Sequence, residues 1–410
     1  MKLHALRLLC GLGAVDGVGA MPTVSAADMI RSVASLLFLA LIGCTGPRQL
    51  SSSGAEAYEA SLASGPGRSA VAWYDTRNGN AEIYAREVSE NGRGVGAEYR
   101  LTSDSADSYE ADIVLIRDAF AVAWYEQTAD GNRHAKMGVW SPDFEPRWTM
   151  NLLSVDRDSR IPVVRTFEDR IFCAWIETPA GGESEIWAGW WDLQGHAVLK
   201  PRMLAAAGST TWNLNAAIDL DGIGYLVFDA QVGTRSEELF LVRVGESGSE
   251  LRRITADDGF ASKYPDLALT PEGAALTWID ARDGNEEVYL FVGSLIDLSD
   301  DVGVRARRVT ESKGESIGAY VAWNGDRVGL AWSDNSAGQH EVYFQSFGSS
   351  GNAISDPDRL TRNRSDSLIP AIQPVGDGFM LTWNEFLPDS RETYGSDTRS
   401  EIVVAVISAF

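Results

Sequence analysis

The sequence predicts an all-β fold of seven similar units, each made of four short strands, and three observations lead to this prediction. An apolar run followed by a carboxylate returns at intervals of 51, 51, 52, 51, 54 and 51 residues. Beyond residue 44 no stretch shows the 3.6-residue apolar period of a helix, whereas short apolar runs bounded by turn residues are frequent. The 40 Gly and 13 Trp in 410 residues suit many tight turns between aromatic-rich strands. Four strands in a unit of about 50 residues are typical of one blade of a β-propeller, so we expect a seven-bladed β-propeller.

The chain begins with a predicted targeting segment, residues 1–43. From Met29 it reads MIRSVASLLFLALIGC, in which Arg31 precedes an apolar run. This run is too short to cross a bilayer as a helix and has the length of a signal-peptide core. Residues 1–28 have no place in this scheme, so either Met29 is the true start or the leader is unusually extended.

The apolar run ends in Leu41-Ile42-Gly43-Cys44, which resembles a bacterial lipoprotein lipobox. The resemblance implies cleavage before Cys44 and lipidation of its thiol, with residues 44–47 as a tether. The expected location is the bacterial cell envelope, at the outer membrane. The alternative is an ordinary signal peptide followed by a chance Cys. The other cysteine of the processed chain, Cys173, lies in an apolar run, so we expect a buried thiol and no disulfide.

The propeller is predicted to occupy residues 48–410. The seven repeated carboxylates are Asp75, Glu126, Glu177, Asp229, Asp280, Asp334 and Glu385. In six units a Trp stands two residues before the carboxylate, and Val227 takes its place in the fourth. We expect these side chains to fill the wedges between neighbouring blades.

Three further features recur in phase with the carboxylates. An outer strand of the form RLT precedes several units, for example Arg100-Leu101-Thr102. A small hydroxyl follows it at Ser108, Ser159, Thr211, Ser262, Ser316 and Ser367, with Ala57 in the first unit. A Glu opens the third strand in most units, as in Glu82-Ile83-Tyr84.

The two ends of the repeat array predict how the ring closes. The first unit starts at Arg48 with RQLSSS, which matches the outer RLT strand, and the last unit stops at Phe410 after its third strand. The N-terminal strand should therefore complete the C-terminal blade. Such closure pairs an otherwise open strand edge.

The pattern D-x-R-x-G-N-x-E-[IV]-Y, followed by R-[LIV]-T, resembles the TolB-type propeller repeat of bacterial envelope proteins. It matches well in the units of Asp75 and Asp280 and in part elsewhere. The resemblance implies the propeller fold. TolB pairs its propeller with a separate N-terminal domain for which residues 48–410 leave no room, so its transport role is not carried over.

The formal net charge of −23 restricts the partners. Such an acidic surface repels nucleic acid and anionic lipid headgroups. We therefore expect no nucleic-acid partner and contact with a membrane through the lipid anchor alone.

The carboxylate-bearing turns should share one face of the propeller with the links between blades. We expect the repeated acids and hydroxyls to be part of the repeat architecture, accepting hydrogen bonds from their own turns. The alternative is a calcium site, since these turns offer hard oxygen ligands. The candidate ligands are Asp75, Asn78, Asn80 and Glu82 in one turn and Asp280, Asp283, Asn285 and Glu287 in another.

Catalytic signatures are scarce. The three His after residue 44, His134, His196 and His340, lie in different units, and no G-x-S-x-G occurs. SPDFEPRW, from Ser141, keeps part of a sialidase Asp box but lacks its Gly and occurs once. The Trp-rich EIWAGWWD, from Glu185, favours packing between blades over a sugar platform. No catalytic set and no cofactor are predicted.

The seventh unit carries an insertion between Glu385 and Glu401 that is longer than the corresponding turns. Long insertions on one face of a repeat protein often form binding sites. Its candidate ligand-binding residues are Asp389, Arg391, Tyr394 and Asp397. We therefore expect a binding or scaffold module for an envelope protein or polymer. The alternative is a carbohydrate-active propeller enzyme, a polysaccharide lyase or glycoside hydrolase, and carboxylates converging on the central mouth would favour it.

Overall fold

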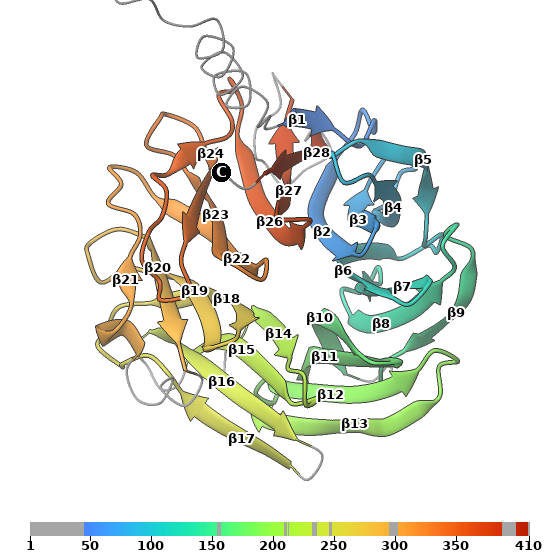
Figure 1. Ribbon diagram of the computed structural model, residues 1–410. Coiled ribbons are helices and arrows are strands. Elements are labelled where there is room, and N and C mark those ends of the chain that lie inside the picture. Colours follow the sequence, from blue (N-terminus) through green and yellow to red (C-terminus); the bar gives the residue numbers. More distant parts are fainter. Residues whose placement is uncertain are drawn as a thin grey trace, which may run out of the picture. The chain divides into compact units, whose positions relative to one another are not determined.

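The computed structural model describes residues 45–153, 157–208, 211, 213–231, 236–245, 248–294, 302–387 and 399–408. These residues form seven four-stranded antiparallel sheets arranged in a ring, within one compact unit from Cys44 to Ala409 (Figure 1). The predicted all-β, seven-bladed β-propeller is confirmed. The leader and Cys44 lie outside the described residues.

The blades follow one another along the chain, and each runs from the centre of the ring outward. Blade 1 holds β2 (Ala57–Gly65), β3 (Arg68–Asp75), β4 (Glu82–Val88) and β5 (Gly94–Arg100). Blade 2 holds β6 (Asp107–Ile116), β7 (Ala119–Gln127), β8 (Arg133–Trp140) and β9 (Pro146–Asn151). Blade 3 holds β10 (Asp158–Phe167), β11 (Arg170–Thr178), β12 (Glu185–Asp192) and β13 (Ala197–Ala206). Blade 4 holds β14 (Leu214–Ile218), β15 (Gly224–Gln231), β16 (Glu237–Gly245) and β17 (Gly248–Arg253).

The remaining blades follow the same order. Blade 5 holds β18 (Ser262–Thr270), β19 (Gly273–Asp280), β20 (Glu287–Gly293) and β21 (Arg307–Arg308), with the short 3-10 turn η2 (Val302–Val304) before its outer strand. Blade 6 holds β22 (Ser316–Trp323), β23 (Val328–Asp334), β24 (Glu341–Phe347) and β25 (Asp358–Arg359). Blade 7 holds β26 (Ser367–Val375), β27 (Gly378–Phe386), β28 (Ser400–Ile407) and, as its outer strand, β1 (Thr45–Gln49).

The N-terminal strand closes the ring as predicted. β1 pairs antiparallel with β28, and Gln49 lies opposite Val403. The hydroxyl of Ser51 donates to the carboxylate of Glu401, and the Ser53 N–H donates to the same carboxylate at 3.1 Å. The predicted boundary at Arg48 is wrong by three residues, because β1 begins at Thr45. Residues 45–47 therefore belong to the strand and do not form a separate tether, since β28 is long enough to pair with them across a bulge.

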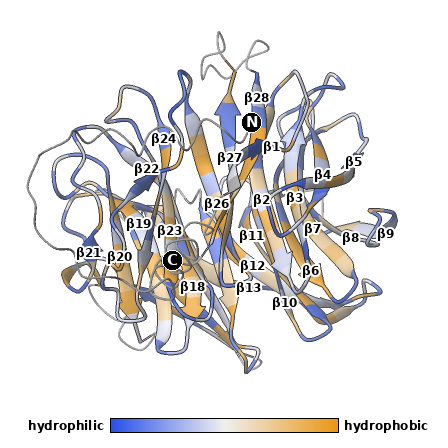
Figure 2. Ribbon diagram, turned by 45° about the horizontal axis from the view of Figure 1, so that its top comes forward, coloured by the Kyte–Doolittle hydropathy of each residue, from blue (hydrophilic) through white to orange (hydrophobic). Residues whose placement is uncertain are grey.

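The apolar side chains gather along the strands and the hydrophilic residues in the turns and links (Figure 2). The repeated Trp side chains are buried between blades, as expected. Trp73 packs with Met380 and Val404 of the neighbouring blade 7, and Val227, which replaces Trp in blade 4, is also fully buried. Burial of these side chains supplies the non-directional attraction that holds neighbouring blades together.

Two smaller expectations are also confirmed. Trp191 of the Trp-rich strand is 3% exposed and clusters with Met137 and Val139 of blade 2, so this strand contributes to packing between blades. Cys173 is buried and free, and burial raises the pKa of its thiol.

Candidate functional site

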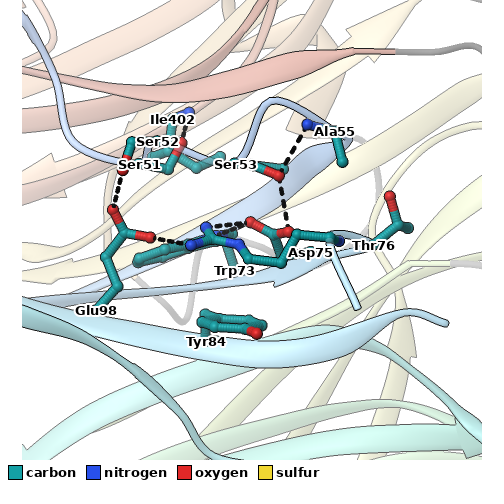
Figure 3. A network of polar contacts seen from close by, with 12 residues as sticks. Ser51, Ser52, Ser53, Ala55, Trp73, Asp75, Thr76, Tyr84, Glu98 and Ile402 are labelled. Atoms are coloured by element: carbon teal, nitrogen blue, oxygen red, sulfur yellow. Dashed lines mark hydrogen bonds and ion pairs between the residues drawn. The ribbon is translucent and has the colours of Figure 1, made fainter. Parts of the chain in front are cut away.

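The repeated carboxylates are held by their own turns. Asp75, fully buried, accepts hydrogen bonds from the Trp73 indole at 3.2 Å, the Ser53 hydroxyl at 2.8 Å and the Arg77 N–H at 2.9 Å (Figure 3). Arg77 also forms an ion pair with it. Asp280 accepts an indole N–H in the same way. The Trp-x-Asp spacing thus satisfies a buried indole and orders the turn, as expected of repeat architecture.

The Glu near the start of the third strand in most blades explains the RLT motif. In blade 6 the Glu341 carboxylate accepts a hydrogen bond from the hydroxyl of Thr361 and one from the guanidinium of Arg359 at 2.6 Å. Glu82 and Glu287 have equivalent Thr and Arg partners. These buried acids are satisfied by charge-assisted hydrogen bonds and fasten the outer strand to the blade.

The candidate calcium ligands are likewise distributed among separate structural networks. In the first turn Asn78 contacts the Tyr84 hydroxyl, and Asn80 donates to the carbonyl of Ala106 at 2.9 Å. In the second turn Asp283 accepts from the Tyr289 hydroxyl, and Asn285 donates to the carbonyl of Gly314 at 2.7 Å. Asp75, Glu82, Asp280 and Glu287 have the partners described above. Within the described ranges no group of three or more His, Cys, Asp or Glu could hold a metal ion, so the geometry gives the calcium hypothesis no support.

The recurring hydroxyls lie directly across the first two strands of a blade from the carboxylates. Ser262 is opposite Asp280, and its hydroxyl donates to that carboxylate at 3.0 Å. Two residues after this position, the inner strand makes a β-bulge in six blades, and the residue there has a left-handed φ between 50° and 58°. A bulge leaves residues without a ladder partner and re-aims a side chain, which is why Pro is tolerated directly after it in three blades.

These bulge residues surround one end of the central channel, on the face where the inner strands begin. We call them the mouth ring, and its members in blade order are Glu59, Glu110, Ile161, Asn213, Tyr264, Gly318 and Ile369. Asn213 holds the same sequence position in blade 4. All seven residues line a central cavity of about 810 Å³, walled by β2, β6, β10, β14, β18, β22 and β26.

A polar belt follows two residues further along the inner strands. Ser61 donates to Asp112 at 2.9 Å, Arg165 pairs with Asp112 at 2.7 Å, and Asp266 accepts the Val321 N–H at 2.7 Å. Asn215 joins Arg165 to Asp266 by hydrogen bonds on either side. Because each bond crosses from one blade to the next, the belt fixes the positions of the inner strands around the channel.

Two mouth-ring residues are acidic, and their surroundings differ. Burial raises the pKa of Glu59 well above its usual value, and the nearby carboxylates Glu110 and Glu56 raise it further. Burial raises the pKa of Glu110 to about 7, while Arg133 and Arg160 act in the opposite direction. Both carboxyls therefore hold protons more tightly than usual, and nearby cations oppose this effect at Glu110, whereas nearby carboxylates add to it at Glu59.

Tyrosines enclose the acidic pair. The rings of Tyr58, Tyr74, Tyr109 and Tyr125 form a continuous series with centroids 6.0, 5.0 and 5.8 Å apart. Burial raises the pKa of Tyr109 to about 12 and, together with Glu59 and Glu56, raises that of Tyr74. The phenols of Tyr74 and Tyr109 therefore stay protonated at neutral pH.

The cations near the mouth are paired with carboxylates. Arg133 makes two hydrogen bonds to Asp158 at 2.8 and 2.7 Å, and Arg160 pairs with the same Asp at 2.9 Å. Lys263 contacts Glu286 at 2.5 Å. With Arg165 held by Asp112, these four cations are already engaged.

The residues predicted to bind a ligand in the long insertion, Asp389, Arg391, Tyr394 and Asp397, lie outside the described residues. Sequence reasoning missed Glu59 and Glu110. A signal was available: the position two residues after the recurring hydroxyl reads Glu, Glu, Ile, Asn, Tyr, Gly, Ile along the chain. In a repeat protein, a position that differs from unit to unit while its neighbours repeat is a candidate for a functional residue.

Comparison with known proteins agrees with the fold. No protein-family model matches the sequence, and no curated protein matches it. Among solved structures, the chain is similar to a polysaccharide lyase of the ulvan lyase type bound to -[GlcA(1-4)Rha3S]-, with 8% identity, a TM-score of 0.58 and coverage of 88% of this chain and 94% of that one.

Two other solved structures are similar at the same level. An α-L-arabinofuranosidase from Fusarium graminearum, in complex with an iminosugar inhibitor, shares 12% identity at a TM-score of 0.52, over 73% of this chain and 92% of that one. A puromycin-hydrolysing peptidase from Mycobacterium tuberculosis shares 13% identity at a TM-score of 0.56, over 85% of this chain. This chain spans only half of that peptidase. At such identities the likeness shows the propeller fold alone. None of these comparisons tests the TolB resemblance, which stays a prediction.

Proposed function

We propose that the chain is a carbohydrate-active propeller enzyme, a glycoside hydrolase whose active site is the mouth of the central channel. The observation that carries this proposal is the pair Glu59 and Glu110, two carboxyls in one water-poor site with unlike electrostatic neighbours. Glycoside hydrolysis uses two carboxyl groups, one protonated and one ionised. The enzyme alternative of the sequence analysis is thus better supported than the binding module, although by carboxylates other than the repeated ones.

The environments assign the two roles. Glu59, with only acidic neighbours, keeps its proton and is the general acid that protonates the leaving oxygen. Glu110, beside Arg133 and Arg160, is the carboxylate that assists attack at the anomeric carbon. The glycosidic C–O bond breaks as the leaving oxygen takes the proton of Glu59. Water adds to the anomeric carbon as the new hydroxyl while its other proton passes to the carboxylate of Glu110, and proton exchange with solvent restores protonated Glu59 and ionised Glu110.

The charge of the site favours a neutral glycan. The four cations near the mouth are engaged by carboxylates, and the chain carries a net charge of −23. A polymer of uronates or sulfated sugars would meet electrostatic repulsion. β-Elimination by a tyrosinate base is also disfavoured, because burial and nearby carboxylates raise the pKa of the tyrosines. These two arguments favour a hydrolase over a lyase. The propeller folds of the lyase and the arabinofuranosidase show that such a scaffold accommodates carbohydrate chemistry.

A turnover assay tests the proposal. The full-length chain, purified in detergent, is incubated with cellulose, xylan, mannan, arabinan or starch, and new reducing ends and products are measured. We expect at least one of these neutral glycans to be cleaved by hydrolysis, without the unsaturated sugar that a lyase leaves. Unsaturated products would contradict the hydrolase. Binding of a glycan without cleavage, or failure on all five, would contradict the enzyme and return the binding module as the better hypothesis.

We also propose that the protein is anchored to the bacterial cell envelope through a lipidated Cys44. The resemblance to a lipobox supports this proposal. None of the described residues belongs to a helix long and apolar enough to cross a membrane. Cys44 directly precedes β1 in the sequence, so the propeller should lie close to the membrane, held at the outer edge of blade 7.

Replacing Cys44 by Ser tests the anchor. We expect the variant to lose incorporation of radiolabelled palmitate and to move from the membrane to the soluble fraction, because the thiol that carries the lipid is removed. Cys173→Ser is the matched control, since its buried thiol is not available for acylation. A Cys44→Ser variant that still labels and sediments with membranes would show that the lipobox interpretation is wrong.

A further inference from the structure

Tyr264 is the mouth-ring residue of blade 5, and its ring is exposed. Its side chain is 44% accessible, whereas Tyr58 and Tyr74 beside the acidic pair are each 7% accessible. Its backbone has a φ of 55°, a left-handed conformation that is strained for a bulky residue. The equivalent residue of blade 6 is Gly318, which adopts the same conformation without this strain. The bulge therefore does not require a side chain here.

The backbone and ring of Tyr264 are held in place. Its N–H donates to Asp229 at 2.9 Å, and Asp229 is in turn held by the Asn213 amide at 2.7 Å. The ammonium of Lys263 lies 5.5 Å from the ring centroid and is itself fixed by Glu286. One face of the ring thus has a neighbour, while the residue as a whole stays exposed.

Tyr264 also lies at the same mouth as the acidic pair. Glu59, Glu110 and Tyr264 all line the same central cavity. A small ligand placed at the carboxyls can therefore extend toward Tyr264. An exposed, rigidly held aromatic ring matches the apolar C–H face of a pyranose, and the acidic surroundings disfavour an anion.

We propose that Tyr264 is a stacking platform that binds a neutral pyranose unit next to the one cleaved between Glu59 and Glu110. This inference rests on the proposed function and adds to it the substrate class and a residue that determines affinity. It explains why an aromatic residue occupies a strained, exposed position that glycine fills in the next blade.

The test measures binding separately from turnover. In a full-length Glu59→Gln background, which blocks proton donation, the dissociation constants of cellohexaose, xylohexaose and mannohexaose are measured by calorimetry. We expect at least one to bind, Tyr264→Gly to weaken it about tenfold and Tyr264→Phe to bind within a factor of three, because the ring and not the hydroxyl makes the contact. Tyr264→Gly copies the residue of blade 6 and removes backbone strain, so it should fold.

Tyr99→Ala is the matched control, because Tyr99 is 36% exposed on the outer strand β5, away from the channel. It should leave affinity unchanged. Equal binding by the Tyr264→Gly variant would overturn the platform while leaving the hydrolase intact. Binding that depends on Tyr264 in a chain that hydrolyses no glycan would support the platform and overturn the hydrolase. No binding of any of the three hexasaccharides would overturn the platform.

Discussion

Glu59→Gln and Glu110→Gln are each expected to reduce glycan hydrolysis by a factor of about 10² to 10⁴, the usual contribution of a positioned general acid or base. Gln preserves the size of the side chain but cannot exchange a proton or carry the charge. The measurement is kcat on the glycan cleaved by the parent chain. Glu145→Gln, on the exposed turn between β8 and β9, is the control and should retain full activity.

The two variants should differ when the leaving group changes. A 4-nitrophenyl glycoside departs without help from an acid, so Glu59→Gln should recover much of its activity on this substrate, whereas Glu110→Gln should not. Equal losses on both substrates would contradict the assignment of roles. The parent rate should rise with pH as Glu110 ionises near its pKa of about 7 and fall at higher pH as Glu59 loses its proton.

The same carboxyls should also make the stability of the protein depend on pH, whether or not a substrate is present. A carboxyl whose pKa is raised on folding binds its proton more tightly in the folded chain. Such a carboxyl lowers the stability of the folded chain least at a pH below its unfolded pKa of about 4.3. The free energy of unfolding then falls as the pH rises from the unfolded pKa through the folded pKa. For Glu110 this decrease spans the range up to a pKa of about 7. We therefore expect Glu110→Gln to melt at a higher temperature than the parent at pH 8 and at a similar temperature near pH 4. If the Glu110→Gln variant melts at a lower temperature than the parent at pH 8, the ionisation of buried Glu110 does not destabilise the protein, contrary to this prediction.

Deleting residues 45–51 should produce the largest loss of stability. The deletion removes β1 from the edge of β28, the buried Leu50 side chain, which is 2% exposed, and the Ser51 hydroxyl that satisfies Glu401. Loss of a buried Leu alone costs about 2–5 kcal/mol, and loss of the hydrogen bond from Ser51 to the Glu401 carboxylate costs about 1.5–3 kcal/mol more. The open edge of β28 should also promote aggregation.

The measurements are the urea midpoint and the elution volume in size-exclusion chromatography. Deletion of residues 248–251 is a matched control, because it trims the exposed outer strand β17 of blade 4 without opening the ring. This deletion should lower the urea midpoint much less than deletion of residues 45–51. If the chain lacking residues 45–51 unfolds at the same midpoint as the parent and stays monomeric, closure by β1 does not stabilise the propeller.

The sequence by itself determined the fold, because the propeller is a repeat. Each blade must bury both faces against its neighbours, so the same apolar run, Trp and carboxylate return at a nearly constant interval. The count of seven and the closure by the N-terminal strand followed from the period and from the incomplete units at the two ends. The register of β1 did not follow, since the pairing of Thr45 depends on the length of β28 and on a bulge that no local pattern marks.

Only the tertiary structure separated the acids that we propose to be catalytic from those that hold the blades together. Residues such as Asp75 and Glu82 stand out in the sequence because they repeat, and several blades use them to accept hydrogen bonds from their own indole, hydroxyl or guanidinium groups. Glu59 and Glu110 are the only two acids at the mouth-ring position of the seven units, and they lie 51 residues apart. Only the closing of the ring brings the bulges of neighbouring inner strands to one mouth, where two arginines oppose the raised pKa of Glu110 and carboxylates raise that of Glu59. These different surroundings are therefore a property of the assembled channel, which no single repeat contains.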